Sequence, residues 1–334
     1  MTLTLPHRAL QRRALFPLLA FAGAPAFAEQ HSLAAPLVSR NLSPFESGLG
    51  MPVMAAANAM KTGHWNLTWD LHWASHAARE TGIEGELELD GETRRQDLRL
   101  VAGITDRLTL MVDVPWVQHS AGSLDSLIDG WHDFWGMPEG DRADQPRDRL
   151  RFAVSGSDEF ALEQSASGLG DVELGLGWQL WGDERQALAS FAQITLDTGD
   201  GRDLTGSGDT AIAAGLRYSR QHCVFSALSC HIQAGLIEPG NLELAHRQRS
   251  LLMFGGLSLA WQPGAKLALI AQLESREGAY EAGPLSTHDL ALWGSLGLRW
   301  QPNADWIVEA QFSEDLKVES APDITFRLAL GRRW

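Results

Sequence analysis

The chain has 334 residues, and 42 Asp and Glu against 27 Lys and Arg give it a formal net charge of −15 at pH 7. This acidic balance argues against nucleic acid as a partner, because phosphate binding requires clustered lysine and arginine side chains. An apolar content of 44% excludes wholesale disorder, and two cysteines are too few for a disulfide-stapled scaffold or a zinc ribbon. We expect no cofactor and no metal site.

The first 28 residues have the layout of a secretory signal peptide. Arg8, Arg12 and Arg13 form a basic leader, residues 14–24 are apolar, and residues 26–28 form a small-x-small cleavage site. The apolar stretch is too short to span a bilayer, and no run of about 18 apolar residues follows later in the chain. The sequence predicts cleavage of residues 1–28 and export of the remainder.

Twelve later segments alternate apolar and polar residues, which places the two kinds of side chain on opposite faces of an extended strand. In the first segment Trp65, Trp69 and Trp73 share one parity, while Asp70 and His72 share the other. The segments lie around residues 65–73, 97–104, 108–116, 172–179, 193–197, 212–218, 231–236, 257–262, 267–274, 289–300, 305–312 and 324–334.

Two architectures produce this pattern, a soluble β-sandwich and a membrane β-barrel. Segment lengths near the ~9–11 residues of a spanning strand favour the barrel, and so does the alternation of short turns with longer loops. The short turns lie at 105–107, 182–185, 262–265 and 301–303, and the longer loops at 74–96, 119–170, 198–208, 238–249, 277–287 and 316–322. We predict an all-β fold, a transmembrane antiparallel β-barrel over residues 64–334.

The number of strands depends on two further stretches that look extended, 84–90 and 150–154. Accepting both gives fourteen strands, but it moves the turn at 105–107 to the outside and the long stretch 119–147 to the periplasm. Treating both as extensions of loops keeps every short turn on the periplasmic side. We therefore predict twelve strands, with fourteen as the alternative.

Tryptophan placement supports the same orientation. If the chain ends on the periplasmic side, six tryptophans fall at that end, each on the apolar parity of its strand. They are Trp65, Trp178, Trp261, Trp300, Trp306 and Trp334. Amphipathic rings at headgroup depth are typical of the aromatic girdle of membrane barrels, so we predict a periplasmic girdle and outer-membrane lipids as a partner.

Two segments outside the strands are candidates for control of the lumen. Apolar residues in the longest loop recur at helical spacing and predict an amphipathic helix, either a lid over the lumen or a brace on the rim. They are Leu124, Leu127, Ile128, Trp131, Phe134 and Trp135. Residues 29–63 precede the first strand and are too long for a plain tail. They form either a hatch in the lumen or an arm in the periplasm.

The polar parity of the strands supplies charged side chains of both signs to the predicted lumen. They are Asp70, His72, Asp97, Arg99, Asp113, Glu173, Asp197, Arg217, Glu274, Arg299, Glu309 and Arg327. Such groups either brace the lumen as ion pairs or line a path for a polar solute. A barrel of twelve strands is wide enough for a narrow channel and narrow enough to be plugged.

Cys223 and Cys230 cannot bond within one straight strand, because seven residues at ~3.3 Å each separate them too far. A bond between them requires a small closed loop at a periplasmic turn. A metal or redox pair is the alternative, and no His or Cys spacing supports it. We expect a structural disulfide.

Several stretches also resemble a known family. Ser39 to Phe45, Ile128 to Pro138 and Asp141-Arg142 are similar to an uncharacterised family of Gram-negative outer-membrane barrel proteins, the domain of unknown function 3187. The resemblance covers roughly residues 36–334. It implies a single barrel in the outer membrane and no established activity or catalytic residue. The ending from Phe326 to Trp334 is similar to the last strand that the barrel-assembly machinery recognises.

The sequence thus favours an outer-membrane channel for a small or lipophilic solute, whose identity it leaves unknown. An outer-membrane hydrolase is the alternative, with His72 or His119 near the outer rim, but no nucleophile motif surrounds the neighbouring serines. A structural or interaction barrel with a blocked lumen is a third hypothesis. No residue is assigned a catalytic role.

Overall fold

The computed structural model describes residues 33–334 except 83–84, 123–148, 157–158, 184, 241, 243–247, 282–283, 285–289 and 318–320. The predicted signal peptide and the predicted loop helix, from Leu124 to Trp135, lie outside the described residues. Within the described residues, the helical element is the 3-10 turn η1 (Ser47–Leu49). No helix in these ranges is both long and apolar enough to cross a membrane.

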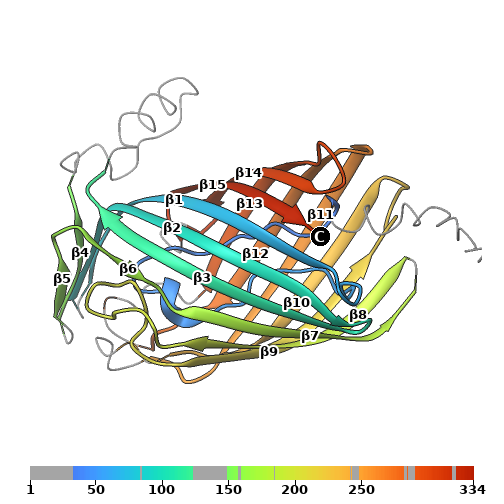
Figure 1. Ribbon diagram of the computed structural model, residues 1–334. Helices are drawn as coiled ribbons and strands as arrows, with labels where there is room; N and C mark the ends of the chain where they lie inside the picture. The colour runs from blue at the N-terminus through green and yellow to red at the C-terminus, as the bar shows by residue number, and fades with distance from the viewer. Residues whose placement is uncertain are drawn as a thin grey trace, which may run out of the picture.

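Twelve antiparallel strands form a closed barrel, as the alternation predicted (Figure 1). The ring closes where the last strand pairs with the first, from Asn66 opposite Arg333 to Ser75 opposite Ile324. The strands are β1 (Trp65–Gly82), β2 (Gly85–Thr105), β3 (Leu108–Ser120), β7 (Val172–Gly182), β8 (Gln186–Leu196), β9 (Ala211–Arg220), β10 (Leu228–Glu238), β11 (Leu252–Gly264), β12 (Leu267–Glu277), β13 (Leu290–Trp300), β14 (Trp306–Asp315) and β15 (Ile324–Arg333).

Three further described strands extend the wall without joining the ring, so the alternative of fourteen barrel strands is wrong. β4 (Arg151–Gly156) pairs with the first residues of β2, and β5 (Phe160–Leu162) pairs with β4. β6 (Ala166–Leu169) pairs with the last residues of β3. The two extended stretches of the sequence correspond to the start of β2 and to β4, and they pair with each other beyond the ring because β2 begins outside it.

The two ends of the barrel differ. The β2–β3 turn after Thr105 and the β7–β8 turn after Gly182 lie at one end with the C-terminus, which we call the turn end. The longer connections and the β4–β5 hairpin lie at the other end, which we call the loop end. The short connection between Gly82 of β1 and Gly85 of β2 also lies there, because most of the predicted loop 74–96 continues these two strands. Figure 1 shows the turn end at the right and the loop end at the left.

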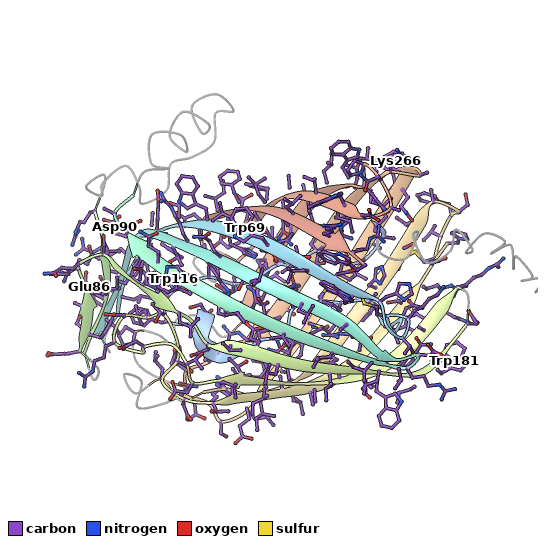
Figure 2. All side chains as sticks on the ribbon, viewed as in Figure 1. Trp69, Glu86, Asp90, Trp116, Trp181 and Lys266 are labelled. Carbon is purple, nitrogen blue, oxygen red and sulfur yellow. A yellow bond between two sulfur atoms is a disulfide. The ribbon has the colours of Figure 1, made fainter. Side chains whose placement is uncertain are left out.

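The alternation of the sequence becomes an apolar outer surface and a polar interior. In β1, Trp69 is 44% exposed, whereas its neighbour Asp70 is fully buried inside the barrel. Large apolar side chains are exposed on strand after strand, among them Leu98, Leu176, Leu216, Leu296 and Leu328. Trp69, Trp116 and Trp181 can be followed on the outer surface in Figure 2. A continuous outer belt of this kind is what a lipid-facing wall requires.

All six tryptophans of the predicted girdle are exposed and lie near the turn end of their strands. The rings of Trp65 and Trp334 stack with centroids 3.9 Å apart, where the first and last strands meet. Arg332 lies over the rings of Trp306 and Trp334, at 5.5 and 4.7 Å. Aromatic rings with cationic neighbours suit the polar headgroup layer.

The two cysteines are bonded in this structure. Cys223 lies in the turn between β9 and β10, Cys230 lies within β10, and their Cα atoms are 6.0 Å apart. The backbone N–H of Cys223 donates to the carbonyl of Leu228 at 3.0 Å, which closes the turn independently of the sulfur atoms. The bond staples a small loop at the turn end.

Candidate functional site

Residues 33–63, which we call the luminal segment, run inside the barrel (Figure 1). The segment begins near the turn end, where Leu33 and Leu37 are buried against small wall residues such as Ala260 and Ala268. The Leu37 N–H donates to Oε1 of Gln272 at 2.9 Å, and Nε2 of the same side chain donates to the Leu37 carbonyl at 3.1 Å. One polar wall side chain thus satisfies both backbone groups of a residue that has no strand partner.

The segment reaches the loop end and then returns. At its far point Tyr280 donates its hydroxyl to the Phe45 carbonyl at 2.6 Å. The returning limb is held by wall side chains: the Ala57 N–H donates to Oγ of Ser219 at 2.8 Å, and the Ala59 N–H donates to Oε1 of Gln179 at 2.8 Å. Both ends of the luminal segment therefore lie at the turn end of the barrel.

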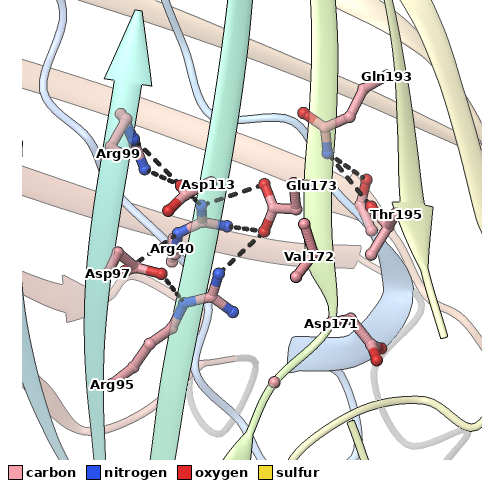
Figure 3. Close-up of polar contacts among 12 residues, drawn as sticks. Arg40, Arg95, Asp97, Arg99, Asp113, Asp171, Val172, Glu173, Gln193 and Thr195 are labelled. Atoms are coloured by element: carbon pink, nitrogen blue, oxygen red, sulfur yellow. Dashed lines mark hydrogen bonds and ion pairs between the residues drawn. The ribbon is translucent and has the colours of Figure 1, made fainter. Parts of the chain in front are cut away.

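An ionic cluster lies where the rising limb crosses the lumen (Figure 3). The Arg40 guanidinium is 2.7 Å from Oε1 of Glu173 and 2.6 Å from Oδ2 of Asp113. Two wall arginines share these acids: Arg95 also contacts Asp97 and Glu173 at 2.7 and 2.9 Å, and Arg99 contacts Asp113 at 2.5 Å. These side chains are at most 9% exposed, so the pairs are buried.

A second ionic group braces the neighbouring strands β1 and β13 to β15 and the start of the segment. Arg327 pairs with Asp70 and with Glu309, and Arg299 also pairs with Glu309. Arg299 donates through Nη1 to the carbonyls of Leu33 and Ala35 and through Nη2 to that of Pro36. Arg299 of the wall thus provides hydrogen bonds to backbone carbonyls of the luminal segment, which is not part of the β-sheet.

A serine–histidine pair that lies outside the predicted site residues connects the two limbs. Ser219 Oγ and His231 Nδ1 are 2.8 Å apart, and Nε2 of His231 is 2.8 Å from the Ala34 carbonyl. A carbonyl only accepts, so Nε2 carries the proton and Nδ1 accepts from the serine hydroxyl. Ser219 also accepts from the Ala57 N–H. Each polar atom of the two side chains has a hydrogen-bond partner. The pair therefore links Ala34 of the rising limb and Ala57 of the returning limb to the barrel wall.

Space in the lumen is unevenly distributed along the barrel axis. A cavity of about 620 Å³ extends from the turn end, beside Asp305 and Trp334, up to Asp70 and Arg99. Around Arg40 and Glu173 lies a separate cavity of about 40 Å³. The loop end above is filled by an apolar cluster in which Phe45 and Leu49 of the segment join wall residues such as Phe152. Within the described residues, the lumen is thus a vestibule that is closed toward the loop end.

Eleven of the twelve predicted lumen residues are buried in strands of the barrel wall. They are Asp70, His72, Asp97, Arg99, Asp113, Glu173, Arg217, Glu274, Arg299, Glu309 and Arg327. Asp197 corrects the prediction: it is exposed in the loop that follows β8, because the strand ends at Leu196, one residue before it. Three residues of this attachment were not among the predicted site residues: Arg40 of the luminal segment, which binds the wall, and Gln233 and Gln272 of the wall, which bind the segment.

Among the described residues, the histidines of the hydrolase hypothesis make no hydrogen bond to a serine. His72 is fully buried, with Nε2 3.6 Å from Oδ2 of Asp97. His119 and His76 both bond the Thr93 hydroxyl, and Nε2 of His119 donates to the Leu204 carbonyl at 3.0 Å. Across the described part of the chain, no group of three or more His, Cys, Asp or Glu side chains could hold a metal ion.

A family model described as "Protein of unknown function (DUF3187)" matches residues 20–334. The chain belongs to this family. The match confirms the resemblance seen in the sequence, and it covers the luminal segment as well as the barrel. No curated protein sequence matches the chain.

Several solved structures match the chain at low sequence identity, and the first of the three named here has a TM-score above 0.5. The COG4313 outer membrane channel from Pseudomonas putida F1 is 16% identical with a TM-score of 0.55, over 83% of this chain and 98% of that one. The KdgM porin is 8% identical with a TM-score of 0.42, over 80% and 98% of the two chains. The toluene transporter TodX of Pseudomonas putida is 12% identical with a TM-score of 0.39, over 90% and 98%.

Proposed function

We propose that this protein is an outer-membrane channel for a small or lipophilic solute, and that the luminal segment is a hatch that closes it. The exposed apolar belt and the tryptophans at the turn end support a membrane location. The fold shared with the COG4313 outer membrane channel is consistent with this proposal. The route we propose is export by the signal peptide, cleavage after Ala28, and insertion by the barrel-assembly machinery acting on β15.

The observation that carries the proposal is the contrast in volume along the lumen. A vestibule of about 620 Å³ is of the size that binds small molecules, yet it ends below the Arg40 cluster, where the structure holds only a separate cavity of about 40 Å³. The obstruction is supplied largely by the chain's own N-terminal segment. It is attached by hydrogen bonds, ion pairs and apolar packing against wall side chains, and no strand of the barrel ladder belongs to it, so its release leaves the ladder intact.

A cross-link tests whether the segment must move. Ser39 Oγ in the segment is 2.9 Å from Ser295 Oγ in the wall, so cysteines at both positions can form a disulfide. In a background with Cys223 and Cys230 replaced by serine, we expect the oxidised S39C/S295C protein to show no solute flux or channel current in planar bilayers. Reduction should restore the flux and the current, because the segment is then free to move away from the wall.

The matched control links two wall strands instead. Ser295 Oγ is 2.8 Å from Ser313 Oγ of the adjacent strand, so S295C/S313C carries the same new bond without tying the segment. We expect its current to be independent of reductant. Equal current in oxidised and reduced S39C/S295C would contradict the hatch. Absence of current in every form, including a variant lacking residues 33–63, would favour the structural barrel with a blocked lumen.

A further inference from the structure

The wall of the vestibule contains one buried arginine that differs from the others. Six arginines of the described residues are buried: Arg95, Arg99, Arg217, Arg276, Arg299 and Arg327. Five of them form an ion pair with a carboxylate. For Arg217 the described part of the chain provides no Asp or Glu within 4.0 Å, although a buried charge is normally paired.

The surroundings of Arg217 hold its guanidinium in place without neutralising it. Nε donates to Oε1 of Gln233 at 2.6 Å, and Nη2 donates to the Val53 carbonyl of the luminal segment at 3.3 Å. The guanidinium carbon lies 4.1 Å from the ring centre of Phe191. The third nitrogen, Nη1, makes no hydrogen bond to a described residue, and the side chain lines the vestibule.

A glycine leaves room in front of that nitrogen. A methyl group at Gly177 of β7 would lie 4.0 Å from Nη1 and otherwise meet no atom in that direction within this distance. Gly177 also lines the vestibule, opposite Arg217 across β8. The position beside Nη1 therefore lies between a fixed cation and a residue without a side chain, where an oxygen atom of an anion can approach the donor.

The rest of the vestibule favours an anion with an apolar body. Its lining contains seven Lys or Arg side chains against three Asp or Glu, and positive charge is in excess even with Arg99 paired to Asp113 behind it, in a chain whose net charge is −15. Apolar side chains of Met54, Met111 and Ala189 lie among them, and methionine adapts its shape to apolar ligands. Cationic walls also raise the local concentration of anions.

We infer that the vestibule binds the carboxylate of a small amphipathic anion at Arg217, with the apolar part of the solute against the methionine-lined wall. The bound carboxylate supplies the counter-charge that the wall lacks, and Nη1 donates to it. The inference deepens the channel proposal and rests on it for its meaning in transport. Binding, however, is measurable whether or not the barrel conducts.

The test compares three probes of equal chain length on the full mature chain in lipid nanodiscs. Octanoate, 1-octanol and octylammonium are titrated calorimetrically, and the signal from empty nanodiscs is subtracted. A charged hydrogen bond to a buried guanidinium predicts that octanoate binds about tenfold or more tightly than octanol, and octylammonium most weakly. Equal affinity for octanoate and octanol would overturn the inference.

Variants assign the preference to the site. Arg217→Met should bring octanoate down to the affinity of octanol, while Arg217→Lys should stay within a few-fold of the wild type. Arg220→Met on the same strand, where the side chain is exposed, should leave both affinities unchanged. Gly177→Val fills the space beside Nη1 and keeps every charge, so it should also abolish the preference, even where Arg217→Met fails to fold. A preference for octanoate that survives in Arg217→Met and Gly177→Val would place the anion elsewhere.

Failure of this inference is distinguishable from failure of the channel. Octanoate binding at Arg217 without flux in planar bilayers would leave the anion site standing and remove the conduit. Flux of octanol equal to that of octanoate, with no difference in binding, would keep the conduit and remove the anion site.

Discussion

Arg40 joins the luminal segment to the wall through ion pairs with Asp113 and Glu173, and strand periodicity gives no signal for it. It lies in a segment without alternation, so no face of a strand predicts which way it points. Its partners Asp113 and Glu173 were predicted as lumen residues, because each lies on the polar parity of a barrel strand. The acids were thus identifiable from sequence, whereas the cation that they share was not.

Removal of the Arg40 charge should weaken the attachment of the luminal segment to the barrel wall. Arg40→Met would leave Asp97, Asp113 and Glu173 buried with only Arg95 and Arg99, and loss of one partner from a buried pair costs about 3–5 kcal/mol. We expect the free energy of unfolding, measured by denaturant titration of the folded protein in vesicles, to fall by that order. The channel should also spend a larger fraction of time conducting in planar bilayers.

An exposed ion pair provides the control for Arg40. Arg79 contacts Glu86 at 2.7 Å with 57% of its side chain exposed, so water and salt screen the pair. Arg79→Met removes the same charge and should leave both stability and conductance close to those of the wild type. Equal effects of the two substitutions would mean that the Arg40 cluster is not what holds the segment.

At the scale of elements, the end of the luminal segment is tied to the β2–β3 turn. The Thr62 hydroxyl donates to Oδ1 of Asp106 at 2.6 Å, and the Thr62 N–H donates to the same atom at 3.4 Å. These two hydrogen bonds lower the pKa of Asp106 below its ordinary value of 3.8. A lowered pKa means that the tie is at full strength above pH 3.8 and weakens as the pH falls through the lowered value.

Loss of the hydroxyl should therefore raise the pKa of Asp106. We expect Thr62→Val to move it toward 3.8, measured by ¹³C NMR titration of the aspartate carboxyl groups, because the stronger donor is gone. Asp183 in the β7–β8 turn is the internal reference: its pKa is lowered by the N–H groups of Arg185 and Gln186 in its own turn. It should not respond to Thr62→Val, and a parallel shift of both groups would indicate a general change of the turn end.

The twelve strands could be predicted because their signal is local. Alternation along each strand and the contrast between short turns and long loops are properties of neighbouring residues, and lipid on one side makes them regular. The path of the luminal segment is not local, since its backbone is satisfied by side chains far away in sequence, such as Gln272 and Ser219. Glycines of the wall mark part of its path: a Cβ at Gly297 would meet Leu37, and a Cβ at Gly256 would meet Met54, each at 2.5 Å.

The whole molecule is organised by two surfaces with opposite chemistry. The interior holds buried ion pairs and a charged vestibule, while the exterior is a belt of leucine and tryptophan that a water-soluble protein of this size would not leave exposed. The luminal segment takes the place of a hydrophobic core, because the barrel wall has no second sheet to pack against. Closure of the ring and exposure of the belt together define which side faces lipid.

Depth-dependent substitution tests that assignment directly. Leu296 is 62% exposed near the middle of β13, and Leu251 is 54% exposed just before β11 at the loop end. If lipid covers the belt, Leu296→Arg should lower the free energy of unfolding in vesicles by about 2–4 kcal/mol, and Leu251→Arg by about 0–1 kcal/mol. If water covered both positions, each exposed substitution would change stability by about 0.5 kcal/mol or less. A difference that follows depth rather than exposure is therefore the result that a lipid-facing wall requires.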